Sequence, residues 1–158
     1  MDLIDVFNTI ERKEDFEHGL PQSGKEIRDL EVALNVKFPE SYKELLQKYG
    51  YISWLGGSIY GPSKDAYYDL LIRNKELREE RLPEGFASPP KEAFLIKDYG
   101  EAYIMLFSDN SPRAGQVGLF LSETGYQEEQ TWESFEALKI IIARELFDVL
   151  HGNFDKGV

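Results

Sequence analysis

The stretch that decides the fold is residues 23–50, S-G-K-E-I-R-D-L-E-V-A-L-N-V-K-F-P-E-S-Y-K-E-L-L-Q-K-Y-G. Ser23 and Glu26 have the S-x-x-E spacing of a capping box, in which the two side chains bind the free amides of a helix start. Apolar residues then recur on one helical face (Ile27, Leu30, Leu34). The first half of the stretch therefore predicts an amphipathic helix of about three turns.

The second half of the stretch predicts another helix. Pro39 suits a first helical position, and Glu40 beside it complements the helix dipole. Apolar and aromatic residues follow at i, i+3, i+4 and i+7 (Tyr42, Leu45, Leu46, Tyr49). Gly50 is placed to end the helix in the left-handed conformation that glycine adopts without strain. Together the two halves predict a pair of packed helices.

On both sides of this helix pair, the spacing of the apolar residues changes several times between that of a helix and that of a strand. We expect a short helix over 3–16 and a middle helix over about 65–80. Strands are expected over 52–55, 58–60, 93–96, 102–107 and 117–121. A long last helix is expected to be capped by Thr131, with its core face on Phe135, Leu138, Ile142, Leu146 and Val149. The sequence thus predicts one α+β domain over 1–158, with a central antiparallel sheet packed by these helices. Its core is expected over 3–150, followed by a frayed tail at 151–158.

Composition limits the classes of partner. The chain has 158 residues, 18 basic against 29 acidic, a net charge of −11 and no cysteine. The electrostatic field of this negative charge repels phosphate backbones and anionic lipids but attracts basic proteins. We therefore expect a protein partner and neither nucleic acid nor membrane. The first residues lack the basic and apolar regions of a signal peptide, and no apolar run is long enough to span a bilayer. A cytoplasmic location is therefore expected.

No motif in the sequence predicts catalysis. The two histidines, His18 and His151, lie beside chain breakers or the tail and belong to no metalloprotease or triad pattern. Residues 88–91 match S-x-x-K, but their two prolines forbid the helical turn that would bring Lys91 onto Ser88. Gly56 and Gly57 lack the lysine and hydroxyl residue of a phosphate loop. Close carboxylates could perform acid–base chemistry, although a solvated acidic face explains them better. We therefore expect no enzyme activity, cofactor or metal.

Tyrosines close to acidic residues are the best candidates for binding. Tyrosine supplies a large contact area at low entropic cost, and nearby carboxylates can pair with lysine or arginine of a partner. Some of these tyrosines are equally expected to be half-buried sheet residues. The candidate partner-binding residues are Tyr60, Tyr67, Tyr68, Asp98, Tyr99, Glu101, Asp109, Glu123, Tyr126, Glu128 and Glu129.

Residues 26–50 resemble the N-terminal signature of the SUKH superfamily, the Syd/US22/Knr4-type domains. The family pattern has an acidic residue and an aliphatic helix, then an L-G-V-x-L-P step, then S-Y-K-x-F-L-x-x-Y-G-G. Here Asn35 stands in place of the glycine, Phe38 in place of the leucine and Tyr51 in place of the last glycine. The order of later elements also agrees, up to a closing segment with Trp132 and Phe135, so the resemblance spans nearly the whole chain.

The resemblance implies a non-enzymatic α+β domain that binds protein. Bacterial members often serve as immunity proteins against the toxin of a polymorphic, contact-dependent or LXG-type system, so a basic secreted toxin, for example a nuclease, is the expected partner. Other members act as intracellular regulatory or scaffolding modules, and this alternative stays open. The signature residues themselves are what a packed helix pair needs, and the family's binding surface varies, so the resemblance assigns no contact residue.

Overall fold

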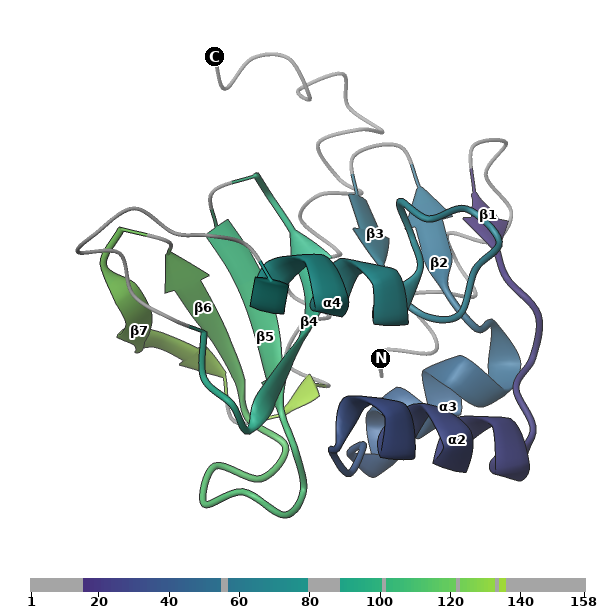
Figure 1. The fold of residues 1–158 in the computed structure, drawn as a ribbon, viewed down its shortest axis with the longest axis horizontal. Helices are drawn as coiled ribbons and strands as arrows, with labels where there is room; N and C mark the ends of the chain where they lie inside the picture. Colours follow the sequence, from purple (N-terminus) through teal and green to yellow (C-terminus); the bar gives the residue numbers. More distant parts are fainter. Residues whose placement is uncertain are drawn as a thin grey trace.

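The computed structural model describes residues 16–54, 57–79, 89–100, 102–121, 123–132 and 134–135. This part of the chain forms three helices and two antiparallel sheets (Figure 1). The helices are α2 (Gly24–Leu34), α3 (Glu40–Lys48) and α4 (Leu70–Glu79). The strands are β1 (Glu17–His18), β2 (Ile52–Trp54), β3 (Gly57–Ile59), β4 (Ala93–Asp98), β5 (Ala102–Phe107), β6 (Val117–Leu121) and β7 (Gly125–Trp132). The α+β class is confirmed.

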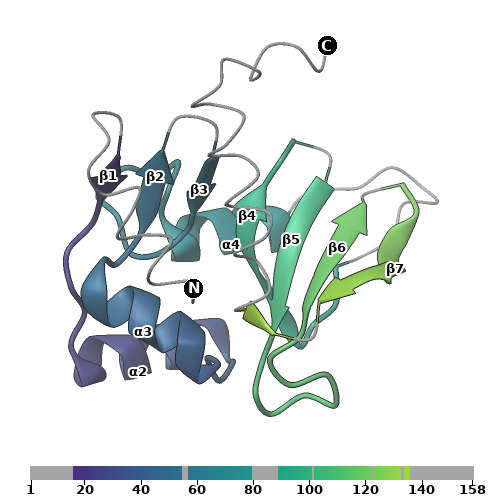
Figure 2. The ribbon, with the colours of Figure 1, turned by 180° about the vertical axis from the view of Figure 1, so that it is seen from behind.

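The expectation of a single central sheet is wrong. The strands form one sheet of order β1-β2-β3 and a second of order β4-β5-β6-β7. Figure 2 shows the two sheets side by side, with β3 next to β4. A backbone hydrogen bond from Tyr60 N to Ile96 O (2.9 Å) joins them, but no ladder continues across. Between these strands the chain leaves β3 to form α4 before it returns as β4, and α4 crosses this junction (Figure 1).

The helix pair forms as its sequence predicts. Ser23 Oγ accepts a hydrogen bond from Glu26 N, and Glu26 Oε1 accepts one from Ser23 N, both at 3.1 Å, which completes the capping box. Asn35 ends α2 in the left-handed conformation (φ 55°), which asparagine tolerates better than most residues. Pro39 lies one residue before α3, and Gly50 (φ 75°) follows the end of α3.

The middle helix begins later than its hydrophobic period predicts. The expected start was residue 65, but α4 begins at Leu70. Asp69 explains the shift, because its carboxylate accepts hydrogen bonds from Ser63 N (2.9 Å) and from Ile72 N (3.1 Å) at the first turn of the helix. Asp65 likewise accepts from Tyr67 N (3.0 Å) and holds the preceding residues in a turn.

The two terminal helices have different outcomes. Thr131 does not cap a helix, because it lies in β7 and pairs with Gly118 of β6. A β-branched residue suits a strand at least as well as a cap, and the ladder to β6 decides between them. The rest of that expected helix (Leu138, Ile142, Leu146, Val149), the tail at 151–158 and the expected helix over 3–16, except for Phe16, lie outside the described residues.

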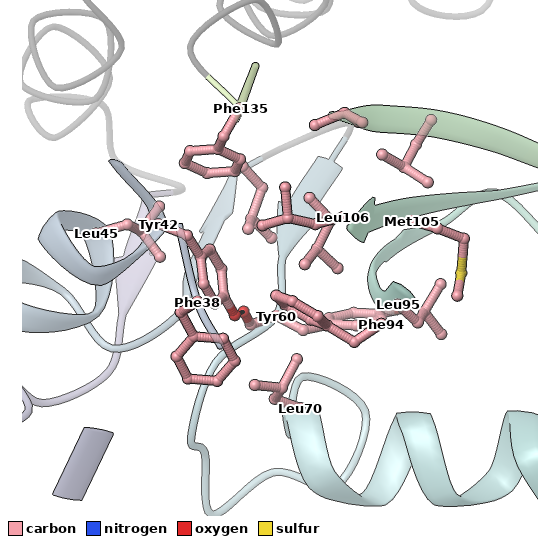
Figure 3. Packing of buried hydrophobic residues seen from close by; sticks show 14 of the residues in the cluster. Phe38, Tyr42, Leu45, Tyr60, Leu70, Phe94, Leu95, Met105, Leu106 and Phe135 are labelled. Atoms are coloured by element: carbon pink, nitrogen blue, oxygen red, sulfur yellow. Dashed lines mark hydrogen bonds between the residues drawn. The ribbon is translucent and has the colours of Figure 1, made fainter. Parts of the chain in front are cut away.

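An aromatic core joins the helix pair to both sheets (Figure 3). The ring of Tyr42 in α3 lies 5.2–5.5 Å, centroid to centroid, from the rings of Phe38, Phe94 and Phe135. Tyr42 Oη also donates to Tyr60 O at 2.5 Å. The signature residues Tyr42, Leu45 and Leu46 are fully buried, so they serve as scaffold, as expected.

Side chains of α4 bind the backbone of β4 on the side away from β5. Asn74, which is buried, donates to Leu95 O (3.0 Å) and accepts from Leu95 N (2.7 Å). One turn later, Arg78 donates to Ala93 O (2.5 Å). These bonds satisfy backbone groups that no neighbouring strand pairs with.

A buried carboxylate closes the loop between α2 and α3. Glu31 is 6% exposed, and its Oε2 accepts a hydrogen bond from Phe38 N at 2.8 Å. We expect Glu31→Ala to lower the free energy of unfolding by about 1–3 kcal/mol, because the buried amide of Phe38 loses its acceptor. Urea denaturation of Glu31→Ala beside Glu44→Ala, an exposed position on α3, measures this effect. Equal losses in the two variants would contradict the structural role of Glu31.

Candidate functional site

Three tyrosines form a continuous aromatic surface beside the first sheet. Tyr51 and Tyr68 are stacked, with ring centroids 5.1 Å apart and planes 7° from parallel. Tyr67 meets Tyr68 edge-on at 5.0 Å and is 57% exposed. Ser53 Oγ donates to Tyr68 Oη at 3.2 Å and fixes this ring on β2. The rings are thus held in place before any partner arrives.

A fourth tyrosine extends this surface toward the second sheet. Tyr99, 48% exposed, follows β4, and the ammonium of Lys97 lies 4.9 Å from its ring centroid and 4.9 Å from that of Trp54. Lys97 also donates to Ser58 O (3.3 Å) and is itself buried. A cation over an aromatic face stabilises the ring in one orientation. We call Tyr51, Tyr67, Tyr68 and Tyr99 the tyrosine surface.

Arg73 of α4 supports the same surface from below. Its guanidinium carbon lies 5.4 Å from the ring centroid of Tyr67 and 5.5 Å from that of Tyr60. The guanidinium also pairs with Asp98 (2.5 Å) and Glu76 (3.2 Å). Because Asp98 ends β4 and Tyr67 precedes α4, this arginine links the end of β4 to the turn that carries Tyr67.

The stacked pair separates two hollows. Tyr51 lines a cleft of about 640 Å³ together with Leu20, which is exposed, and the 62–65 turn. Tyr68 lines a smaller pocket of about 260 Å³, whose wall also includes Tyr67, Trp54 and Tyr99. We call them the Tyr51 cleft and the Tyr99 pocket. Two hollows on either side of a fixed aromatic wall suit the side chains of a protein partner better than a flat face would.

The Tyr51 cleft is electronegative. Its lining includes Glu26, Asp65 and Asp69 against one lysine, Lys64. Burial raises the pKa of Tyr51, and the nearby carboxylates of Glu17 and Asp65 raise it further, against a hydrogen bond with Ser63 that lowers it. Of these effects, the nearby carboxylates are the one that also favours a positive charge on a bound group.

The structure brings together four of the residues predicted to bind a partner and buries a fifth. Tyr67, Tyr68, Asp98 and Tyr99 all line the Tyr99 pocket. Tyr60 corrects the prediction, because it is 0% exposed and lies in the core, where burial raises its pKa to about 12. It follows β3 directly at the junction of the sheets, where both sides of the chain are covered.

The remaining predicted residues are not part of this group. Asp109 and Glu123 are exposed, but Asp109 precedes β6 and Glu123 follows it, so they lie at opposite ends of that strand. Glu101 lies outside the described residues. Tyr126, Glu128 and Glu129 are in β7, and their side chains are likewise outside the described part. The predicted set is therefore not one patch.

Sequence reasoning missed three residues of the site. Tyr51 was noted only as a replacement for a glycine, and its residue type alone does not show that its ring stacks on Tyr68. Arg73 and Lys97 were not singled out, since the cation–π contacts that give them a role join residues up to 43 positions apart, as from Lys97 to Trp54. Only the fold shows such contacts.

Among the residues that the structure describes there is neither a metal-binding group nor a membrane-spanning helix. No group of three or more histidine, cysteine, aspartate or glutamate residues there is arranged to hold a metal ion. None of the helices in this part is long and apolar enough to cross a membrane.

Fold and site together define a two-sheet α+β domain that carries a preformed aromatic surface. Residues 24–138 match the SUKH family model described as SMI1-KNR4 cell-wall, and since this is well over half of the chain, the protein belongs to that family. A crystal structure of a protein from Pseudomonas syringae pv. tomato has a similar fold, with a TM-score of 0.64 at 16% identity, covering 86% of this chain and 94% of that one. No curated protein matches the sequence.

Proposed function

We propose that this protein is a non-enzymatic immunity protein that binds and neutralises a cognate bacterial toxin in the cytoplasm, and that the tyrosine surface is its toxin-binding face. The family to which the chain belongs includes immunity proteins. The observation that carries the proposal is the tyrosine surface itself, with its stacked rings between two hollows. Its chemistry is that of a protein interface.

The rigidity of the rings supports tight binding. Tyrosines are among the residues that contribute most to protein interfaces, especially where they lie in well-packed surroundings. Tyr67 and Tyr68 are held by each other, by Arg73 and by Ser53, so little freedom is lost when a partner covers them. A preorganised surface binds more tightly than a mobile one of equal area.

The charge supports a basic toxin. The chain carries a net charge of −11, and the Tyr51 cleft is lined by more carboxylates than cations. Such a field accelerates the encounter with a basic partner and aligns it. Association should therefore slow as salt concentration rises.

The biological test is co-expression. The reading frame adjacent to this gene is expected to encode a secreted protein with a toxin domain, and cells expressing that domain should survive only when this chain is present. If the neighbouring product is harmless alone, or kills equally with and without this chain, the immunity function is refuted.

The molecular test removes single tyrosines from the surface. Tyr67→Ala and Tyr99→Ala are each expected to weaken toxin binding about thirtyfold, which corresponds to about 2 kcal/mol. Calorimetric titration with the purified toxin domain measures the affinity, and thermal unfolding checks that each variant is folded. Val32→Ala is the matched control, since Val32 is 80% exposed on α2, outside both hollows. Unchanged affinity in both tyrosine variants would remove this surface as the toxin-binding face.

A further inference from the structure

A further hollow lies between α2 and α4, above the start of β4. It has a volume of about 390 Å³ and shares no lining residue with the Tyr51 cleft or the Tyr99 pocket. Its floor is apolar and comes from three elements, with Leu34 of α2, Leu71 of α4 and Phe94 of β4. Its rim consists of Lys75, Arg78 and Lys91. We call this hollow the basic groove.

Arg78 is a fixed cation at this rim. Its guanidinium donates hydrogen bonds to the carbonyl oxygens of Pro89 (3.0 Å), Pro90 (2.7 Å) and Ala93 (2.5 Å). These acceptors are neutral, and burial without a compensating carboxylate lowers the pKa of Arg78. The side chain is thus held in one position with its charge unbalanced by any acidic side chain in the described part of the chain.

The two lysines of the rim are in the same situation. Lys75 and Lys91 are exposed and form no ion pair with an acidic residue that the structure describes. Elsewhere the chain does pair its cations, as Lys25 with Asp29, Lys43 with Glu40 and Arg73 with Asp98. In a protein with 29 acidic and 18 basic residues, three cations that pair with no acidic residue of the described part and surround one apolar hollow are a local reversal of charge.

We propose that the basic groove binds an acidic segment of a second protein partner, which places an apolar side chain on Leu34, Leu71 and Phe94 and pairs flanking carboxylates with Lys75, Arg78 and Lys91. The three cations explain why the ligand is a polypeptide. Lys75 and Arg78 lie one turn apart on α4, and Lys91 comes from the turn before β4, so several separate carboxylates are needed to match them. A fatty acid offers only one, and a second copy of this chain carries the same net charge of −11 and is repelled.

This inference goes beyond the toxin-binding function, because it assigns a second site of opposite charge on another face of α4. Arg73 and Glu76 of this helix belong to the tyrosine side, whereas Leu71, Lys75 and Arg78 belong to the basic groove. One domain could then hold two partners of different charge at the same time. The basic groove also gives a specific binding surface to the alternative function in this family, that of a regulatory or scaffolding module.

The test uses the full chain, labelled with ¹⁵N, and the synthetic peptide Glu-Glu-Leu-Phe-Glu-Glu as probe. We expect amide shifts at residues 33–34, 71–78 and 91–94, and not at the tyrosine surface. The peptide Glu-Glu-Ser-Ser-Glu-Glu, which lacks apolar side chains, and decanoate should each bind at least tenfold more weakly. Absence of shifts in the groove, or equal binding of either comparison ligand, would overturn the proposal.

Charge reversal provides the matched control. The double variant Lys75→Glu/Lys91→Glu is expected to bind the peptide at least tenfold more weakly, whereas Lys25→Glu/Lys64→Glu, which changes the net charge equally at positions outside the groove, should bind with less than a threefold change. Equal loss of peptide binding in the two double variants would show that only the net charge matters. It would overturn the basic groove as the binding site. The groove variant should still protect against the toxin. Loss of protection would place the toxin in the groove and overturn the assignment of a second partner.

Discussion

Replacing Tyr42 by alanine is expected to lower the free energy of unfolding by about 4 kcal/mol or more, a large share of the roughly 5–15 kcal/mol that stabilises a typical domain. Tyr42 is 0% exposed, and its ring contacts Phe38, Phe94 and Phe135 from three parts of the chain (Figure 3). Alanine would leave a cavity at the point where α3 meets both sheets. Much of the loss therefore comes from packing.

The hydroxyl of Tyr42 contributes separately. It donates to Tyr60 O, and burial raises the pKa of Tyr42 far above its ordinary value, so the group stays protonated and remains a donor. Tyr42→Phe keeps the ring and removes only this bond, and is expected to cost about 1–3 kcal/mol because Tyr60 O loses its partner. Urea denaturation of both variants gives the two losses. If phenylalanine costs as much as alanine, or alanine costs less than about 2 kcal/mol, the packing role assigned to the ring is refuted.

The helix pair was predictable because its signals are local. The capping box of Ser23 and Glu26 and the glycine at position 50 act within one turn of the residues that they affect. The strands 93–98, 102–107 and 117–121 were also found near their predicted bounds for the same reason, since a short apolar run bounded by turn residues is visible in a short window. β1 and β7 were not predicted at all: β1 has only two residues and pairs with the distant β2, whereas β7 pairs with its neighbour β6 but consists mostly of polar residues.

The division into two sheets was not predictable from such windows. It depends on the path of α4 across the junction and on side chains that replace strand pairing, notably Asn74 on the backbone of Leu95. The candidate site shows the same limit. The tyrosines at 67, 68 and 99 were identified by residue type, but whether Tyr60 points into the core and Tyr51 into the cleft depends on the tertiary structure.

Gly61→Ala is expected to be the second most damaging substitution, with a loss of about 3 kcal/mol or more in the free energy of unfolding. A Cβ atom at this position would lie 2.0 Å from Gly50 O and 2.6 Å from Gly50 C, both of which are backbone atoms. Gly61 cannot move away, because its nitrogen donates to Tyr68 O (3.3 Å) and its oxygen accepts from Leu70 N (2.9 Å). Relief of the clash must therefore break either the packing against Gly50 or the hydrogen bonds to Tyr68 and Leu70.

The same substitution should damage the tyrosine surface. Gly50 precedes Tyr51, and Gly61 binds the backbone of Tyr68, so the close approach of the two glycines sets the distance between the stacked rings. Gly61→Ala should thus reduce the near-ultraviolet circular dichroism of the tyrosines and weaken toxin binding even at temperatures where the variant is folded. Gly24→Ala is the control, because the nearest atom to its Cβ would be the flexible Arg28 Nη1 at 3.4 Å and alanine favours the start of α2. A stable Gly61→Ala variant with unchanged tyrosine spectra would show that the two backbone segments can separate without cost, and that the stack does not depend on them.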